Sequence, residues 1–73
     1  MIQATVVCTS KVRVGMNGRV RVRFEAEDGP LINKRWSDGP PELQQEIILN
    51  RENARNFDVG ECYTVVIGLS EPA

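Results

Sequence analysis

The sequence predicts one small domain that is mainly β, an antiparallel barrel or sandwich of the OB or SH3-like kind with one short helix before the last strand. Three observations predict this class. Apolar and polar residues alternate over long stretches near both ends of the chain, and turns rich in Gly and Pro separate the stretches. The length of 73 residues suits a single domain with a thin core.

The first stretch, residues 2–14, is predicted to be one long strand. Its even-numbered positions, from Ile2 to Val14, are mostly apolar, and its odd-numbered positions are mostly polar. A period of two directs one face of a strand to the core, so we expect the even face to be buried. The length of the run also predicts a bend or a bulge near Ser10.

Residues 19–26 repeat the alternation and are predicted to form the second strand of a hairpin. Directly opposed residues of an antiparallel pair share a face, so Val14 must oppose an even-numbered residue if the two apolar faces are to coincide. A two-residue Asn-Gly turn fails this test. A loop of residues 16–18 places Val14 opposite Val20 and gives Gly18 a left-handed conformation. We therefore expect the three-residue loop.

The middle of the chain leaves alternatives open. Residues 31–36 lie between two turns that contain Gly-Pro pairs, and they form either a short strand or an ordered loop. Residues 42–50 contain strand formers and helix formers. The preceding Pro-Pro pair and the β-branched Ile47-Ile48 pair favour a strand there.

The end of the chain predicts a capped helix and a last strand. Asn50 is a suitable N-cap for a helix over residues 51–57, in which Ala54 and Phe57 would face inward. Residues 62–69 are apolar at most positions and are expected to form a strand buried on both faces. The tail of residues 71–73 is expected to be loose.

The composition argues against an enzyme. The chain has no His, which removes the commonest general base and metal ligand, and its carboxylates and lysines form no catalytic motif. Cys8 and Cys62 lack the number and spacing of a zinc site or a disulfide framework, so each is expected to behave as a small buried apolar residue. A disulfide bond between Cys8 on the first strand and Cys62 on the last strand is the alternative. We expect no catalytic residue, cofactor or metal.

Membrane and secretion signals are also missing from the printed sequence. No stretch approaches the roughly 20 apolar residues of a membrane span, and the first residues lack the basic-then-apolar layout of a signal peptide. The sequence therefore predicts a cytoplasmic protein without membrane contact.

Three short motifs carry a family resemblance. They are Ala-Thr-Val-Val-Cys-Thr-Ser at residues 4–10, Trp36 followed by Gly-Pro-Pro-Glu-Leu at 39–43, and the run NRENARNFDVGECYTVVI at 50–67. In these motifs the chain resembles a set of small phage-encoded and prophage-encoded β-rich proteins of mostly unassigned function. It departs from them at Arg51, where Pro is common, and at Cys62, where a second aromatic is common. The resemblance implies a small phage-type β domain in the host cytoplasm, and it implies no functional residue.

The candidate binding surface is the basic face of the predicted hairpin. The expected register places Arg13 opposite Arg21 and Lys11 opposite Arg23, and the first 23 residues include no acid. Opposed like charges destabilise a sheet, so a compensating anion is expected. That anion is either a carboxylate of Glu42 or Glu46 on a neighbouring strand, with salt screening the rest, or an external ligand. The candidate binding residues are Lys11, Arg13, Arg19, Arg21, Arg23, Lys34, Arg35 and Trp36.

We expect a non-enzymatic accessory protein that binds a protein partner, such as a host factor, or a second copy of itself through this face. The alternative is a single-stranded nucleic-acid binder in which Trp36 stacks on a base. A pI near 5.3 counts against that alternative, and a lone Trp beside two prolines more often closes a small core. A small anionic ligand ranks third, because the chain has no Gly-rich phosphate loop.

Overall fold

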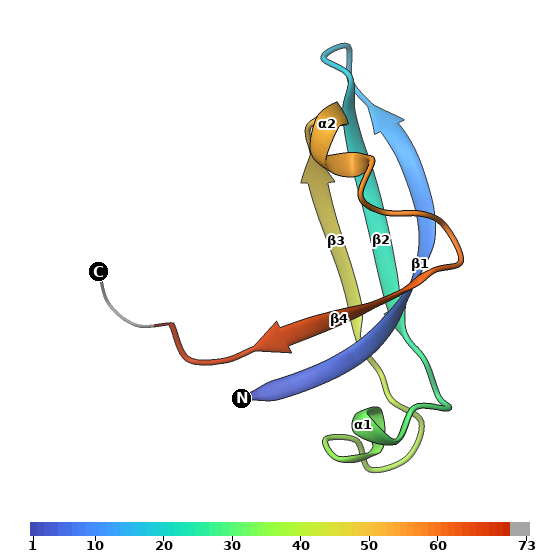
Figure 1. Ribbon diagram of the computed structural model, residues 1–73, viewed down its shortest axis with the longest axis vertical. Helices are drawn as coiled ribbons and strands as arrows, with labels where there is room; N and C mark the ends of the chain where they lie inside the picture. The colour runs from blue at the N-terminus through green and yellow to red at the C-terminus, as the bar shows by residue number, and fades with distance from the viewer. Residues whose placement is uncertain (71–73) are drawn as a thin grey trace.

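The computed structural model describes residues 1–70 as a four-stranded antiparallel sheet with two short helices (Figure 1). The sheet order is β3-β2-β1-β4. The elements are β1 (Ile2–Val14), β2 (Arg19–Ala26), α1 (Leu31–Lys34), β3 (Gln44–Leu49), α2 (Arg51–Ala54) and β4 (Cys62–Ile67). The mainly β class is confirmed, but within residues 1–70 the sheet does not close, so the predicted barrel is not confirmed. The tail predicted to be loose lies outside the described residues.

The long strand β1 pairs with two other strands. Its first half, Ile2 to Val7, pairs with β4, and its second half, from Val6 onward, pairs with β2. The register with β2 shifts between Cys8 and Ser10, which confirms the bulge predicted near Ser10. The strand curves so strongly that its first half and β4 leave the rest of the sheet together as a two-stranded arm (Figure 1).

The core is small and lies on one face of the sheet. Val6, Cys8, Val22 and Phe24 are buried at its centre. An aromatic trio closes it, with ring centroids 5.3 Å apart for Phe24 and Phe57 and 5.8 Å apart for Phe24 and Tyr63. Both pairs are edge-to-face, the geometry that the ring quadrupoles favour. We call this side of the sheet the core face and the opposite side the outer face.

The helix α2 packs on the core face over β2 and β3. The Asn50 side chain accepts a hydrogen bond of 2.8 Å from Asn53 N–H, which confirms the predicted N-cap. Ala54 is buried, and Phe57 joins the aromatic trio, as the sequence predicts. The helix is shorter than the predicted range of 51–57. The predicted strand over residues 42–50 is confirmed as β3.

The segment predicted to be a strand or a loop begins with a one-turn helix, α1. Its buried residue is Asn33, whose Nδ2 donates to the carbonyls of Thr5 (2.8 Å) and Glu27 (2.7 Å). Asn33 Oδ1 accepts from Thr5 N–H at 2.8 Å. The Asn33 amide thus takes the place of a strand beside β1 after β2 has ended, which fixes α1 against the sheet.

Two burial predictions for the end of the chain are wrong. The last strand was expected to be buried on both faces, but Thr64, Val66 and Ile67 are exposed. The reason is position: β4 is an edge strand, and the small core reaches one face only. Cys62 is exposed while Cys8 is buried, and both are free thiols.

Candidate functional site

The hairpin register differs from the predicted one. The loop has four residues, 15–18, and Val14 lies opposite Arg19, so the three-residue loop with Val14 opposite Val20 is wrong. Gly15 and Gly18 both have left-handed backbones, with φ of 70° and 73°. Only glycine adopts this conformation without steric cost, and the presence of two such positions supports the longer loop.

This register divides the predicted basic face in two. Lys11 lies opposite Val22 and Arg13 lies opposite Val20, so both cations belong to the core face. The three arginines of β2 belong to the outer face; they are Arg19, Arg21 and Arg23. The physical cause is the bulge in β1, because one extra residue exchanges the faces of every residue that follows it. The prediction that all five cations share one face is therefore wrong.

The outer-face arginines are partly neutralised within the chain. Glu46 on β3 places one carboxylate oxygen 3.1 Å from Arg21 Nε and the other 3.4 Å from Arg23 Nε. Arg21 Nε donates no hydrogen bond, so that contact is an ion pair without hydrogen-bond alignment. Pairing with Glu46 was the simpler of the two expected outcomes, and it is confirmed for Arg21 and Arg23. Half-exposed ion pairs of this kind contribute roughly 0–1 kcal/mol each.

The other three candidate binding residues, which are Lys34, Arg35 and Trp36, lie at the opposite end of the molecule from the hairpin loop. Lys34 ends α1, and Arg35 and Trp36 follow it, far from the hairpin loop (Figure 1). Trp36 is half-buried and lines a cavity of about 250 Å³ beside Met1 and the rest of the N-terminus. The structure therefore does not bring Trp36 together with the hairpin cations.

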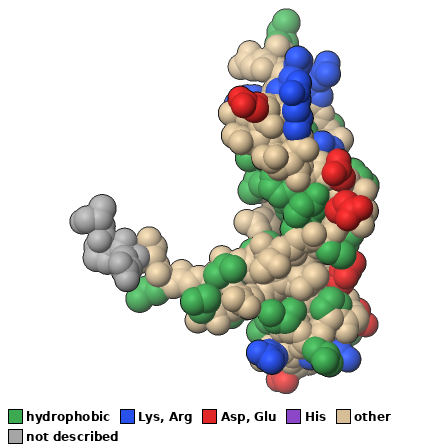
Figure 2. Space-filling view, viewed as in Figure 1, with side chains coloured by type: hydrophobic (Ala, Val, Ile, Leu, Met, Phe, Trp, Pro, Cys, Tyr) green, Lys and Arg blue, Asp and Glu red, His purple; other side chains and the backbone are tan. Residues whose placement is uncertain are grey.

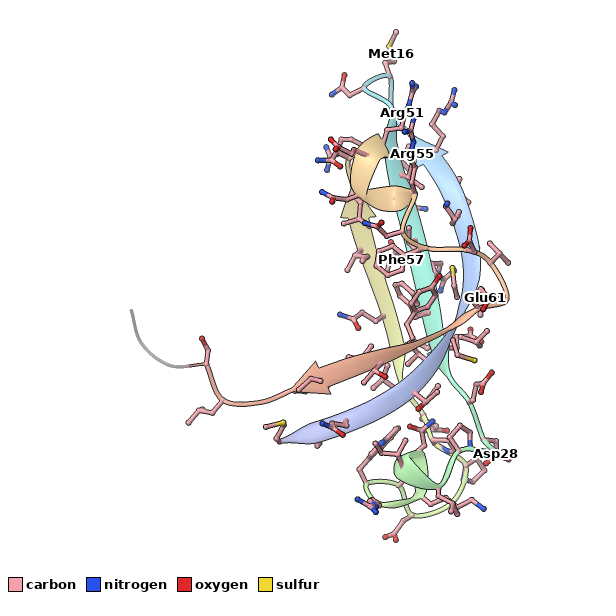
Figure 3. The ribbon with its side chains drawn as sticks, in the orientation of Figure 1. Met16, Asp28, Arg51, Arg55, Phe57 and Glu61 are labelled. Atoms are coloured by element: carbon pink, nitrogen blue, oxygen red, sulfur yellow. The ribbon has the colours of Figure 1, made fainter. Side chains whose placement is uncertain are left out.

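Two basic residues outside the predicted set lie beside the hairpin. Arg51 and Arg55 are carried by α2 and its C-cap, on the same side of the helix because they are four positions apart (Figure 3). Arg51 reaches the hairpin loop: a Cβ at Gly18 would lie 3.3 Å from Arg51 Nη2. The spacing of the two arginines after the Asn50 cap was the signal in the sequence that could have identified them.

Lys11, Arg13, Arg51 and Arg55 therefore occupy the hairpin end of the core face, and we call them the basic cluster. All four are exposed, and none takes part in an ion pair among residues 1–70. Figure 2 shows Lys and Arg side chains gathered at this end around α2. Glu52 lies on the same helix, but it makes no ion pair with them in the described part of the chain. Concentrated charge of one sign attracts anions of the other.

Neither a metal site nor a membrane-spanning helix is present in the described part of the chain. Within residues 1–70, no group of three or more His, Cys, Asp or Glu residues is placed to hold a metal ion. No helix there has the length and hydrophobicity to cross a membrane. Comparison with protein-family models, with curated proteins and with solved structures finds no match.

Proposed function

We propose that this chain is a non-enzymatic accessory protein of phage type, acting in the cytoplasm, that binds an acidic surface of another protein through the basic cluster. One observation carries the proposal. Four exposed cations from two separate elements lie on the same face at the hairpin end of the sheet, and no carboxylate in the described residues pairs with them. Three of the four are arginines, whose planar guanidinium groups bind carboxylates through two parallel hydrogen bonds.

A protein partner is better supported than single-stranded nucleic acid. Nucleic-acid binders of this size combine cations with exposed aromatic rings on which bases stack. Here Phe24, Phe57 and Tyr63 pack edge-to-face against one another around the core, and Trp36 lies at the opposite end of the sheet. A formal net charge of −1 also opposes binding to a phosphate backbone away from the basic cluster.

The proposal is tested with two variants that remove the same number of arginines. In the cluster variant Arg13, Arg51 and Arg55 become Ser, and in the control variant Arg19, Arg21 and Arg23 become Ser. The probe is a fluorescent peptide of about 16 glutamates, with binding followed by anisotropy at about 50 mM salt. We expect the cluster variant to bind at least about tenfold more weakly than the unmodified chain, and the control variant to stay within about threefold.

Two outcomes would contradict the proposal. Equal losses in both variants would mean that the peptide responds to net charge and not to the basic cluster. A second probe, an oligothymidylate of similar length, tests the alternative function. Tighter binding of that probe than of the peptide, with quenching of Trp36 fluorescence and a steep loss of affinity in salt, would favour single-stranded nucleic acid as the ligand.

A further inference from the structure

The backbone of β4 is paired on one side and open on the other. Cys8 N–H donates to the carbonyl of Glu61, so the odd-numbered residues of this segment direct their backbone groups toward β1. Alternation then directs the N–H and C=O groups of Cys62, Thr64 and Val66 away from β1. Because β4 is the last strand in the sheet order, no strand of residues 1–70 pairs with these groups.

This open edge lacks the protection that monomeric proteins usually have. Residues 62–69 contain no charge and no proline, which are the common devices against edge pairing. Val66 is 56% exposed and Ile67 is 51% exposed. The other edge strand, β3, differs, because it carries Glu46 in contact with two arginines and is packed against α2. Of the two edges, β4 is therefore the one suited to pairing.

The molecule also exposes more surface than a compact monomer of its size. A compact protein of 8.2 kDa exposes about 4,500 Å², whereas this chain exposes 5647 Å². Its radius of gyration is 13.8 Å, against about 11 Å for a compact domain of this length. The excess is about 1,100 Å². One partner contributes about 800 Å² to a standard stable interface, so the excess is large enough to supply one side of such an interface.

We propose that two copies of this chain form a dimer by antiparallel pairing of their open β4 edges around a two-fold axis near Val65. Thr64 of one copy then lies opposite Val66 of the other, and these residues exchange backbone hydrogen bonds. The same alignment sets Cys62 opposite Gly68, so the whole uncharged segment is paired. A two-fold axis makes the contact self-complementary and closed, which prevents further growth along the edge.

The pairing also covers apolar side chains on both faces of the arm. On the outer face each Val66 side chain lies opposite Thr64 of the other copy and diagonally across the axis from its Val66. On the core face the two Val65 side chains meet at the axis, and Ile67 lies opposite Tyr63 of the other copy. Figure 2 shows hydrophobic side chains along this arm. The basic cluster lies at the opposite end of β1, so the dimer leaves it accessible, and this inference does not depend on the proposed function.

Sedimentation equilibrium of the full chain, with a reducing agent to keep the thiols of Cys62 apart, tests the dimer. We expect a mass of twice 8.2 kDa at high concentration. Val66→Lys adds a charge at the open edge and should weaken the dimer at least about tenfold. Ile48→Lys is the matched control, because Ile48 is a β-branched residue that is 45% exposed on the other edge strand. It should change the affinity by less than about twofold.

Hydrogen exchange of the unmodified chain decides the case even if Val66→Lys fails to fold. The amides of Thr64 and Val66 should exchange more slowly as the protein concentration rises, while those of Tyr63 and Val65, which face β1, should not change beyond the general effect of dimer formation on stability. A chain that stays monomeric at every concentration overturns the proposal. A dimer in which Thr64 and Val66 gain no protection, or that Ile48→Lys weakens as much as Val66→Lys, overturns it too. Growth into open-ended assemblies would also contradict the two-fold contact.

Discussion

Asn33 is the residue on which the attachment of α1 to the sheet depends most directly. It is fully buried, and its amide serves three backbone groups, those of Thr5 N–H, Thr5 C=O and Glu27 C=O. Asn33→Ala removes all three hydrogen bonds. Because an unsatisfied buried polar group costs about 1–3 kcal/mol, we expect the free energy of unfolding to fall by about 3 kcal/mol in urea denaturation.

The control for this prediction is Asn56→Ala, a change of the same type at an exposed residue in the turn after α2. Surface substitutions of this kind usually change stability by less than about 0.5 kcal/mol. If the two variants unfold at the same urea concentration, the buried amide does not stabilise the fold in the way we describe.

Cys62 is exposed but is expected to be a slow nucleophile. Its Sγ donates to Glu27 Oε1 at 3.3 Å, and this hydrogen bond, together with the negative charges of Glu27 and Glu61, raises the pKa of the thiol above its ordinary value of 9.0. A raised pKa keeps the thiol protonated, and the thiolate is the reactive form. We expect Cys62 to react with iodoacetamide more slowly than a free thiol between about pH 8 and 9.5.

Replacing Glu27, the hydrogen-bond acceptor, tests whether it causes the raised pKa of Cys62. Glu27→Gln removes one charge and should increase the rate of alkylation at a given pH, whereas Glu25→Gln, an exposed change two residues away, should leave it unaltered. The raised pKa of Cys62 also makes the free energy of unfolding depend on pH. A raised folded-state pKa stabilises the fold below the unfolded-state pKa, and this contribution is lost as the pH rises through the folded-state value. An unmodified chain that reacts as fast as the Glu27→Gln variant would refute the role of Glu27.

At the scale of elements, α2 is a short helix whose start depends on one side chain. The Asn50 cap satisfies the N–H of Asn53, and the helix carries Arg51 and leads into Arg55 of the basic cluster. Asn50→Ala should lower the free energy of unfolding by about 1 kcal/mol, within the range of 0.5–2 measured for caps. It should also weaken binding of the glutamate peptide, because the two arginines lose part of their fixed placement.

The matched variant is Asn53→Ala, which changes the same residue type in the same helix but keeps the backbone N–H that the cap needs. Since Ala is the better helix former, this variant should be as stable as the unmodified chain or slightly more stable. If Asn50→Ala and Asn53→Ala lower the free energy of unfolding equally, the Asn50 cap does not stabilise α2 in the way we propose.

The β1–β2 hairpin shows how one local irregularity decides which face a side chain occupies. Up to Cys8 the even-numbered residues of β1 face the core, as the alternation predicts, and after the bulge Lys11 and Arg13 face that side. Val12, expected in the core, is consequently 49% exposed. The bulge was predicted near Ser10, but its effect on the following residues was not.

Across the whole molecule, the curvature of β1 separates the hairpin end, which carries the basic cluster, from the end that carries α1 and the arm (Figure 1). At that second end α1 packs against the first half of β1, and Trp36 lines a cavity with residues of the N-terminus. The two proposed contacts therefore use different surfaces. A dimer joined through β4 would present two basic clusters at its outer ends, which suits simultaneous contact with two acidic sites.

Features that depend on local patterns could be predicted from the amino-acid sequence. Alternation with a period of two predicted the strands, Asn50 predicted the cap of α2, and the inward placement of Phe24, Ala54 and Phe57 followed from spacing. These features were predictable because their physical causes lie within a few residues along the chain.

The alignment of the strands and the surroundings of their side chains depend on tertiary contacts and could not be predicted from local patterns. Register depends on which residue of β1 bulges and on the loop length, and one residue of difference moves Lys11 and Arg13 to the other face. The burial of Asn33, the exposed face of β4 and the approach of α2 to the hairpin all depend on contacts between segments far apart in sequence. Alternation shows that a strand has two faces, but the contacts across the sheet determine which face is covered.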